Sequence, residues 1–98
     1  MILEVAFLNV IPSQESAFEA AFRRAVPILT GARGYITHEL RRSIEHTSSY
    51  ILLVQWQTLE DHTVGFRTLP RYQEWKALLH HFYDPFPTVE HFGSTLTP

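Results

Sequence analysis

Hydrophobic residues at the start of the chain form a run that is typical of a β-strand. Residues Ile2–Ile11 are mainly β-branched and aliphatic, and Pro12 ends the run. Successive side chains of a strand point to opposite faces, so one face carries Ala6, Leu8 and Val10 and the other Val5, Phe7 and Ile11. Since both faces are apolar, we expect both to be covered in the folded protein.

The next segment has the spacing of an amphipathic helix. Ser13 suits the N-cap position because its hydroxyl can accept a hydrogen bond from a free backbone N–H. Apolar residues then recur at steps of four, three and four: Phe18, Phe22, Ala25 and Leu29. Pro27 has no N–H and clashes with the preceding turn, so we expect the helix to end or kink near Val26.

Two further strands follow, with the pattern of a hairpin. We predict strands at Gly34–Glu45 and Tyr50–Thr58, joined by a polar turn at His46–Ser49. Alternation in the first of them places Ile36, His38 and Leu40 on one face and Tyr35, Thr37 and Glu39 on the other.

The last third of the chain predicts two helical segments and a strand. Thr58 and Asp61 have the spacing of a capping box for a short helix that runs to about Arg67. Pro70 suits the first turn of another helix, whose buried stripe is Tyr72, Trp75, Leu79 and Phe82. The final strand is expected at Thr88–Thr95.

The order strand, helix, strand, strand, helix, strand is the ferredoxin-like βαββαβ motif. The predicted fold class is therefore α+β, with a four-stranded antiparallel sheet that carries its helices on one face. The length fits one domain spanning residues 1–98. Because Ile2–Ile11 is apolar on both sides, we expect the second face of the sheet to be buried against another subunit.

Composition and charge exclude several classes of function. The formal net charge is −2, which gives no basic surface for nucleic acid or an anionic membrane. No apolar run approaches the roughly 18 residues of a membrane helix, and the apolar start carries Glu4 and lacks the basic residues of a signal peptide. The absence of cysteine excludes disulfides and thiolate sites and fits a cytoplasmic location.

The six histidines do not have the spacing of a metal motif. There is no HExxH pair, and His80 and His81 would point about 100° apart on a helix. A site built from His38 and His91 in three dimensions has no motif behind it, so we predict no metal.

Two segments carry a resemblance to a known family. The run LVQWQTLEDHTVGFRTLPRYQEWKALLHHF and the later PFPTVEHF resemble the antibiotic biosynthesis monooxygenase family. The resemblance implies a homodimer in which two sheets pack into a dimeric α/β barrel, with a ligand pocket between the sheet and the helices of each subunit. It also implies oxidation of phenolic or quinol-like compounds by O₂ without metal, flavin or haem.

The same family includes haem-degrading enzymes, whose signature differs from this chain. These enzymes have an asparagine on the first strand, a tryptophan on the helix after the hairpin and a haem-ligating histidine further on. The matching positions here hold Ala6, Phe66 and Lys76. Asn9 should face the opposite side of the strand from Ala6, so haem degradation is not expected.

His62 is the candidate catalytic residue. It shares a helical face with Phe66, and its unperturbed pKa lies near neutrality, so it could act as a general base on a phenolic hydroxyl. Ionising the phenol makes the ring electron-rich enough to pass an electron to O₂. The alternative interpretation is a partly exposed histidine beside Asp61 that has no catalytic role.

Other aromatic and histidine side chains are candidates for substrate binding. Flat ligands stack well on aromatic walls, and the candidates for this role are Trp56, Phe66 and Tyr72. His38 and His91 could be hydrogen-bond donors or bases in the pocket, although a structural role at the dimer interface or in the barrel interior is favoured. Arg67 and Arg71 could attract an anionic substrate, but solvated surface positions explain them more simply.

The sequence therefore favours an O₂-dependent oxidation of a small aromatic compound by a homodimer. Two other functions fit the same scaffold. One is a non-catalytic ligand-binding protein, and the other is an isomerase or lyase that needs only proton transfer.

Overall fold

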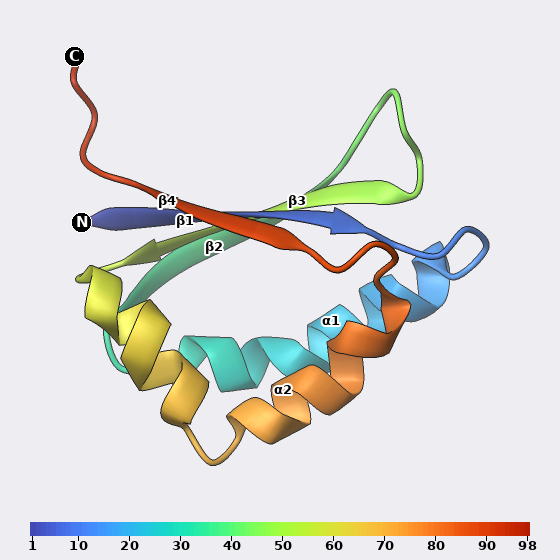
Figure 1. Ribbon diagram of the computed structural model, residues 1–98, viewed down its shortest axis with the longest axis horizontal. Coiled ribbons are helices and arrows are strands. Elements are labelled where there is room, and N and C mark those ends of the chain that lie inside the picture. Colours follow the sequence, from blue (N-terminus) through green and yellow to red (C-terminus); the bar gives the residue numbers. More distant parts are fainter.

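A four-stranded antiparallel sheet with its helices on one side makes up the protein (Figure 1). The structure is a computed structural model that describes residues 1–98. The strands are β1 (Ile2–Asn9), β2 (Tyr35–Arg42), β3 (Ser49–Trp56) and β4 (Thr88–Phe92), in the order β2-β3-β1-β4. The two helices are α1 (Glu15–Thr30) and α2 (Tyr72–Leu79). This topology confirms the predicted ferredoxin-like α+β fold.

Three short helical turns complete the helical layer. They are η1 (Asp61–Gly65), η2 (Phe66–Thr68) and η3 (His80–Phe82). In Figure 1, η1 and η2 cover the end of the sheet at which β1 starts, and α2 with η3 runs beside α1 beneath it. None of the helices is both long and apolar enough to span a bilayer.

The hydrophobic core lies between the sheet and the helices. Alternate residues of β1 and β3 point into it, among them Ala6, Leu8, Leu52 and Val54. The stripe predicted for α1 supplies Phe18, Phe22, Ala25 and Leu29, all of which are buried. Full burial of a phenylalanine or leucine side chain contributes roughly 1.5–3 kcal/mol, so the stripe stabilises the packing of α1 on the sheet.

The opposite face of the sheet carries apolar side chains that no helix covers (Figure 1). Its centre is formed by Leu3, Val5, Phe7, Ile51, Leu53 and Phe92, here called the open face. Phe7 is 45% exposed and Phe92 51% exposed. The sequence correctly predicted that β1 is apolar on both sides.

Helix α1 differs from its prediction at both ends. Ser13 has a φ of 77°, which is not the conformation of an N-cap, and Gln14 occupies that position without a side-chain hydrogen bond. Pro27 lies inside the helix, which continues to Thr30. Pro27 and Arg23 are both exposed, so the carbonyl of Arg23 that loses its helical partner can be hydrated. The predicted end near Val26 is therefore wrong.

A β-bulge in β2 changes the predicted faces of that strand. Tyr35 pairs with Trp56 while Thr37 pairs with Gln55, so Ile36 is an extra residue in β2. Tyr35 consequently shares the helix-facing side with His38, and Tyr35 Oη lies 2.6 Å from His38 Nδ1. Alternation alone placed these two residues on opposite faces, which is wrong because it assumed an unbroken strand.

The capping box at Thr58 and Asp61 is confirmed, but what it starts is not an α-helix. The Thr58 N–H donates to Asp61 Oδ2 at 3.1 Å, and the Asp61 N–H donates to Thr58 Oγ1 at 3.2 Å. The following residues form a π-helical turn, η1, and then a 3₁₀ turn, η2. Gly34, with φ 83°, lies against this cap, and a β-carbon there would be 2.1 Å from Asp61 Oδ2.

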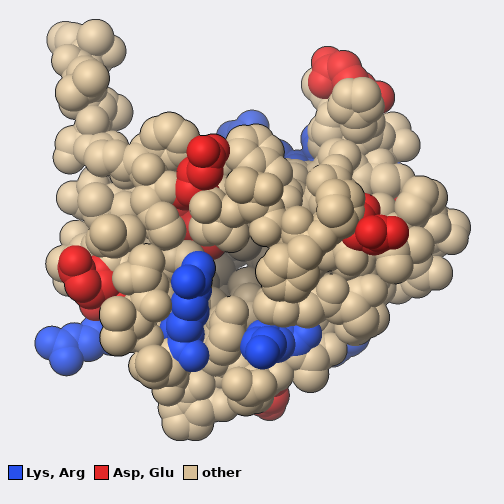
Figure 2. Space-filling view, viewed as in Figure 1, with Lys and Arg blue, Asp and Glu red and all other residues tan.

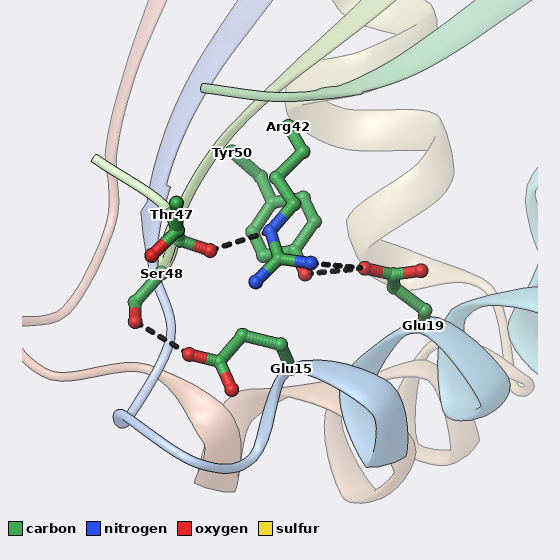
Figure 3. A network of polar contacts seen from close by, with 6 residues as sticks. All are labelled: Glu15, Glu19, Arg42, Thr47, Ser48 and Tyr50. Atoms are coloured by element: carbon green, nitrogen blue, oxygen red, sulfur yellow. Dashed lines mark hydrogen bonds and ion pairs between the residues drawn. The ribbon is translucent and has the colours of Figure 1, made fainter. Parts of the chain in front are cut away.

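A polar network joins α1 to the β2–β3 hairpin (Figure 3). We call it the hairpin network; its members are Glu15, Glu19, Arg42, Thr47, Ser48 and Tyr50. Ser48 Oγ donates to Glu15 at 2.6 Å, and Tyr50 Oη donates to Glu19 at 2.6 Å. Arg42 lies 3.7 Å from Glu19 and donates to the Thr47 carbonyl at 2.5 Å.

Candidate active site

A cavity of about 350 Å³ lies between the sheet and the helical layer. Eleven of its 16 lining residues are hydrophobic. Figure 2 shows a hollow in this face of the molecule, with basic side chains on its helical side. Arg67 is the one lysine or arginine among the lining residues. A small cavity with apolar walls and a few polar groups is the usual form of a small-molecule site.

The walls of the cavity come from several elements. The sheet contributes Ala6, Leu8, Leu52, Val54 and Val89, and the helical segments contribute Leu29, Phe66, Tyr72 and Trp75. Phe66 packs edge-on against Tyr72 and Trp75, with ring centroids 5.3 Å away in both cases. These three rings form a rigid aromatic wall that suits a flat ligand.

Two ionisable side chains are buried at the end of the cavity where β1 starts. Glu4 is 6% exposed and His62 is 5% exposed, and both line the cavity. Trp56 Nε1 donates a hydrogen bond to Glu4 Oε1 at 2.9 Å, and His62 Nε2 lies 3.3 Å from the same oxygen. His62 Nδ1 lies 2.8 Å from His91 Nε2. We call Glu4, Trp56, His62 and His91 the buried carboxylate network.

The π-helical turn holds the His62 ring in place. The imidazole stacks on Trp56, with centroids 5.4 Å apart and planes inclined by 26°, and it also stacks on Phe66 at 6.2 Å. π-Helical turns are rare and occur frequently at functional sites. With a ring on two sides and a partner for Nδ1, His62 has little freedom to rotate.

Burial shifts the pKa values of this network. It lowers the pKa of His62 to about 3, and the positive charge of Arg67 acts in the same direction. Burial also raises the pKa of Glu4, although the Trp56 hydrogen bond and the charge of Arg67 oppose that shift. The pKa of His91 is likewise lowered by burial. His62 is therefore a neutral imidazole at neutral pH.

The structure brings together some of the residues that the sequence singled out. His62, Phe66 and Tyr72 line the cavity. His91 lies behind this lining, where it contacts His62. Trp56 is fully buried and holds Glu4, and His38 is outside the lining, where it bonds Tyr35 and packs on Phe22.

Further residues also line the cavity. Arg67 lines the cavity, whereas Arg71 pairs with Glu74 on the surface. His80 and Tyr83 also line it, and burial lowers the pKa of His80 and raises that of Tyr83. Trp75, which its helical spacing had suggested was a core residue, borders the cavity as well.

Glu4 is the polar residue that the sequence reasoning missed. Its signal was present, because Glu4 is the one carboxylate on the strand face that carries Ala6, Leu8 and Val10. A charged residue on an otherwise buried face needs a partner, and that partner lies far along the chain. The candidate pair His38 and His91 does not meet, and no group of three or more ligand-type side chains is arranged to hold a metal ion.

Comparisons with known proteins agree with the architecture. The family model described as antibiotic biosynthesis monooxygenase matches residues 1–78. The uncharacterized protein YczJ of Bacillus subtilis (strain 168) is 60% identical over 92 residues, which cover 94% of this chain and 97% of YczJ. A Bordetella bronchiseptica structure named after the same family has a TM-score of 0.92 at 38% identity, covering 97% of each chain.

A more distant structure shares the fold. A mutant of SnoaB, a cofactor-independent oxygenase from Streptomyces nogalater, has a TM-score of 0.82 at 18% identity, covering 98% of this chain and 94% of SnoaB.

Proposed function

Because the chain belongs to the antibiotic biosynthesis monooxygenase family, we propose that it is a cofactor-independent monooxygenase for a small phenolic or quinol-type aromatic compound. The observation that carries this proposal is the buried pair Glu4–His62 at the border of an aromatic-walled cavity. The description of SnoaB as a cofactor-independent oxygenase supports the reaction class.

The chemistry needs a base, a dry cavity and a fixed orientation of the substrate. The buried side chains of Glu4 and His62 act together as the base that takes the phenolic proton. One electron then passes from the phenolate to O₂ to give superoxide. The two radicals combine through a new C–O bond at a ring carbon that bears hydrogen, and the proton held by the base moves to the distal oxygen to complete a hydroperoxide. Loss of water gives a quinone, so one atom of O₂ enters the product and the other leaves as water.

The cavity favours the first of these steps. Phe66, Tyr72 and Trp75 exclude water and hold a flat ring by stacking. The guanidinium of Arg67 supplies a positive charge that stabilises a developing phenolate. His62 is neutral at neutral pH, so it adds no competing positive charge to the base.

We further propose that the chain is a homodimer, in which two open faces pack together to form a barrel. The open face has exposed Phe7 and Phe92 next to Leu53 and Ile51, and burial of such apolar side chains stabilises association. Sedimentation at micromolar concentration should show a dimer, and Leu53→Asp should shift it to a monomer. A wild type that sediments as a folded monomer would contradict this assembly.

The reaction is tested by O₂ uptake. Purified protein in chelator-treated buffer is mixed with anthrone and with substituted hydroquinones and naphthols, and O₂ consumption and quinone formation are followed together. We expect about one O₂ per quinone formed. Conversion of a compound without O₂ uptake would instead indicate an isomerase or lyase, and binding without conversion would indicate a ligand-binding protein.

A further inference from the structure

We propose that Glu4, through its Oε2 atom, is the group that accepts the proton of a phenolic ligand, and that His62 and His91 are positioning residues. The inference deepens the proposed function and rests on it. It assigns the acid–base step within the buried pair to the carboxylate and not to the imidazole.

The two oxygens of Glu4 have different surroundings. Oε1 accepts the hydrogen bond from Trp56 at 2.9 Å and has His62 Nε2 at 3.3 Å. Oε2 makes no hydrogen bond within the protein, yet no side-chain oxygen or nitrogen is both fully buried and without a partner. Oε2 therefore keeps accessible surface, and the space that Glu4 borders is the cavity.

The nitrogens of His62 are both directed at protein groups. Nδ1 lies 2.8 Å from His91 Nε2, and Nε2 faces the Glu4 carboxylate. Beside an ionised carboxylate, Nε2 must carry the ring proton, because a nitrogen lone pair would be repelled by the oxygen. Nδ1 then accepts a hydrogen bond from His91 Nε2–H, and the neutral ring has no free lone pair for a ligand.

This arrangement suits a carboxylate base. The Trp56 N–H donates to Oε1 and His62 Nε2 lies 3.3 Å from the same oxygen, so the orientation of the carboxylate is fixed and Oε2 is left for the ligand. The titratable or charged groups around Glu4 are His62 from η1, His91 from β4 and Arg67 from η2, with Tyr72, His80 and Tyr83 elsewhere in the cavity wall. Arg67 is the permanent cation among them, and it favours the ionised form of Glu4. The ligand class is an aromatic ring system that donates a hydroxyl proton.

The test uses a pair of probes that differ in one hydroxyl. Affinities of 2-naphthol and of 2-methoxynaphthalene, which cannot donate a hydrogen bond, are measured by fluorescence titration at about pH 7.5, where both probes are neutral. A hydrogen bond to a charged acceptor favours the naphthol in the wild type by about tenfold or more. No turnover is needed for this measurement.

Glu4→Gln is the decisive variant. The Trp56 N–H, which donates to Oε1, holds the amide oxygen at that position, so the amide NH₂ takes the place of Oε2 and cannot accept the naphthol proton. The preference for 2-naphthol should fall to less than about threefold, while affinity for the methyl ether stays unchanged. Glu45→Gln, an exposed carboxylate in the turn between β2 and β3, is the matched control and should keep the wild-type preference.

Two results would overturn the assignment. One is a preference that survives Glu4→Gln but is lost in His62→Gln, which would make the imidazole the acceptor. The other is an absence of binding of either probe to the wild type. The O₂-uptake assay stands apart from this test: no uptake with any compound defeats the proposed oxygenase, while the naphthol preference still decides the role of Glu4.

The positioning role of His91 has its own readout. His91→Ala removes the hydrogen bond to His62 Nδ1, so the ring proton of His62 is no longer held on Nε2 next to Glu4. The ionised carboxylate is then less stabilised, and the pH midpoint at which the naphthol preference appears should move upward. A ¹⁵N spectrum of the wild type should show His62 protonated at Nε2 and unprotonated at Nδ1. An unchanged midpoint, or a His62 protonated at Nδ1, would remove His91 from the assignment.

Discussion

The buried carboxylate network and the hairpin network lie at opposite ends of the same strand. Both depend on a residue on the helix-facing side of β3: Trp56 donates to Glu4 at 2.9 Å, and Tyr50 donates to Glu19 at 2.6 Å. Each donor is almost fully buried and each acceptor is a carboxylate. The two hydrogen bonds are therefore chemically similar, and the networks differ in what surrounds each carboxylate.

Access to water and the nature of the partners differ between the two networks. The Glu19 side chain is 33% exposed and has Arg42 nearby, whereas Glu4 is buried with histidine and tryptophan partners. Burial raises the pKa of Glu4, while a hydrogen bond from Ser48 lowers that of half-buried Glu15. In the hairpin network the shifted partner is Tyr50, whose pKa rises to about 12 through burial and the nearby Glu19. The partly hydrated carboxylates of Glu15 and Glu19 join α1 to the hairpin, whereas the desolvated carboxylate of Glu4 borders the cavity, where we propose that it acts as a base.

The largest expected effect is a difference in turnover between a variant of the buried carboxylate network and a variant of the hairpin network. His62→Ala removes the group that orients Glu4, so turnover should fall by about 100-fold or more. Glu19→Gln removes a charge from the hairpin network and should leave turnover near the wild-type value. Initial rates of O₂ uptake check both variants, and circular dichroism confirms that each is folded. Equal losses in the two variants would show that the networks do not differ in function.

The second prediction concerns stability below neutral pH. The pKa of His62 is lowered in the folded state from 6.5 to about 3, so the unfolded chain binds the extra proton between these values. The free energy of unfolding should therefore fall as the pH is lowered from 6.5 towards 3, by up to about 1.4 kcal/mol per pH unit.

Glu4 contributes with the opposite sign, because its raised pKa favours the folded state below the pH at which it ionises. Urea unfolding at several pH values measures the slope. His62→Gln should flatten it, and a slope equal to that of the wild type would contradict the buried neutral imidazole.

The third prediction compares the two aromatic donors directly. Trp56→Phe leaves a buried carboxylate without one of its donors and opens space in the core, which should lower the free energy of unfolding by about 2–4 kcal/mol. Tyr50→Phe leaves Glu19 free to bind water and should lower it by only about 0.5–1.5 kcal/mol. Denaturant unfolding at one pH gives both values. A larger loss for Tyr50→Phe would reverse the comparison.

The smallest effect is expected at Arg67. Arg67→Gln removes a positive charge that lowers the pKa of Glu4, so that pKa should rise further and the acid limb of the rate profile should move to higher pH. At about pH 8, turnover should change by less than about tenfold. An acid limb that stays in place would show that Arg67 does not act on the base.

Local patterns were sufficient to predict most of the fold. Alternation marked the strands, the Phe18–Phe22 spacing marked α1, and the Thr58–Asp61 cap was confirmed. The errors lie where tertiary surroundings decide the outcome. Pro27 is tolerated because its side of α1 meets solvent, where the free carbonyl of Arg23 can be hydrated.

The candidate site was less accessible to sequence reasoning. His62 and Phe66 were found because they share one helical face, and the family resemblance implied a pocket between the sheet and the helices. Glu4 was missed because its role depends on β1 and η1 meeting in space, a contact that no local pattern contains. Likewise, His62 of η1 stacks on Trp56 of β3, which is a contact between segments that no local pattern contains.

Gly34 connects two parts of the molecule that the chain separates widely. It has no side chain, so Asp61 can sit directly on the backbone where α1 gives way to β2. Any bulkier residue would displace Asp61 and loosen the start of the segment that carries His62. We therefore expect substitution of Gly34 to lower the proposed activity, although every residue that lines the cavity is unchanged. A set of substitutions restricted to the cavity lining would not reveal this dependence.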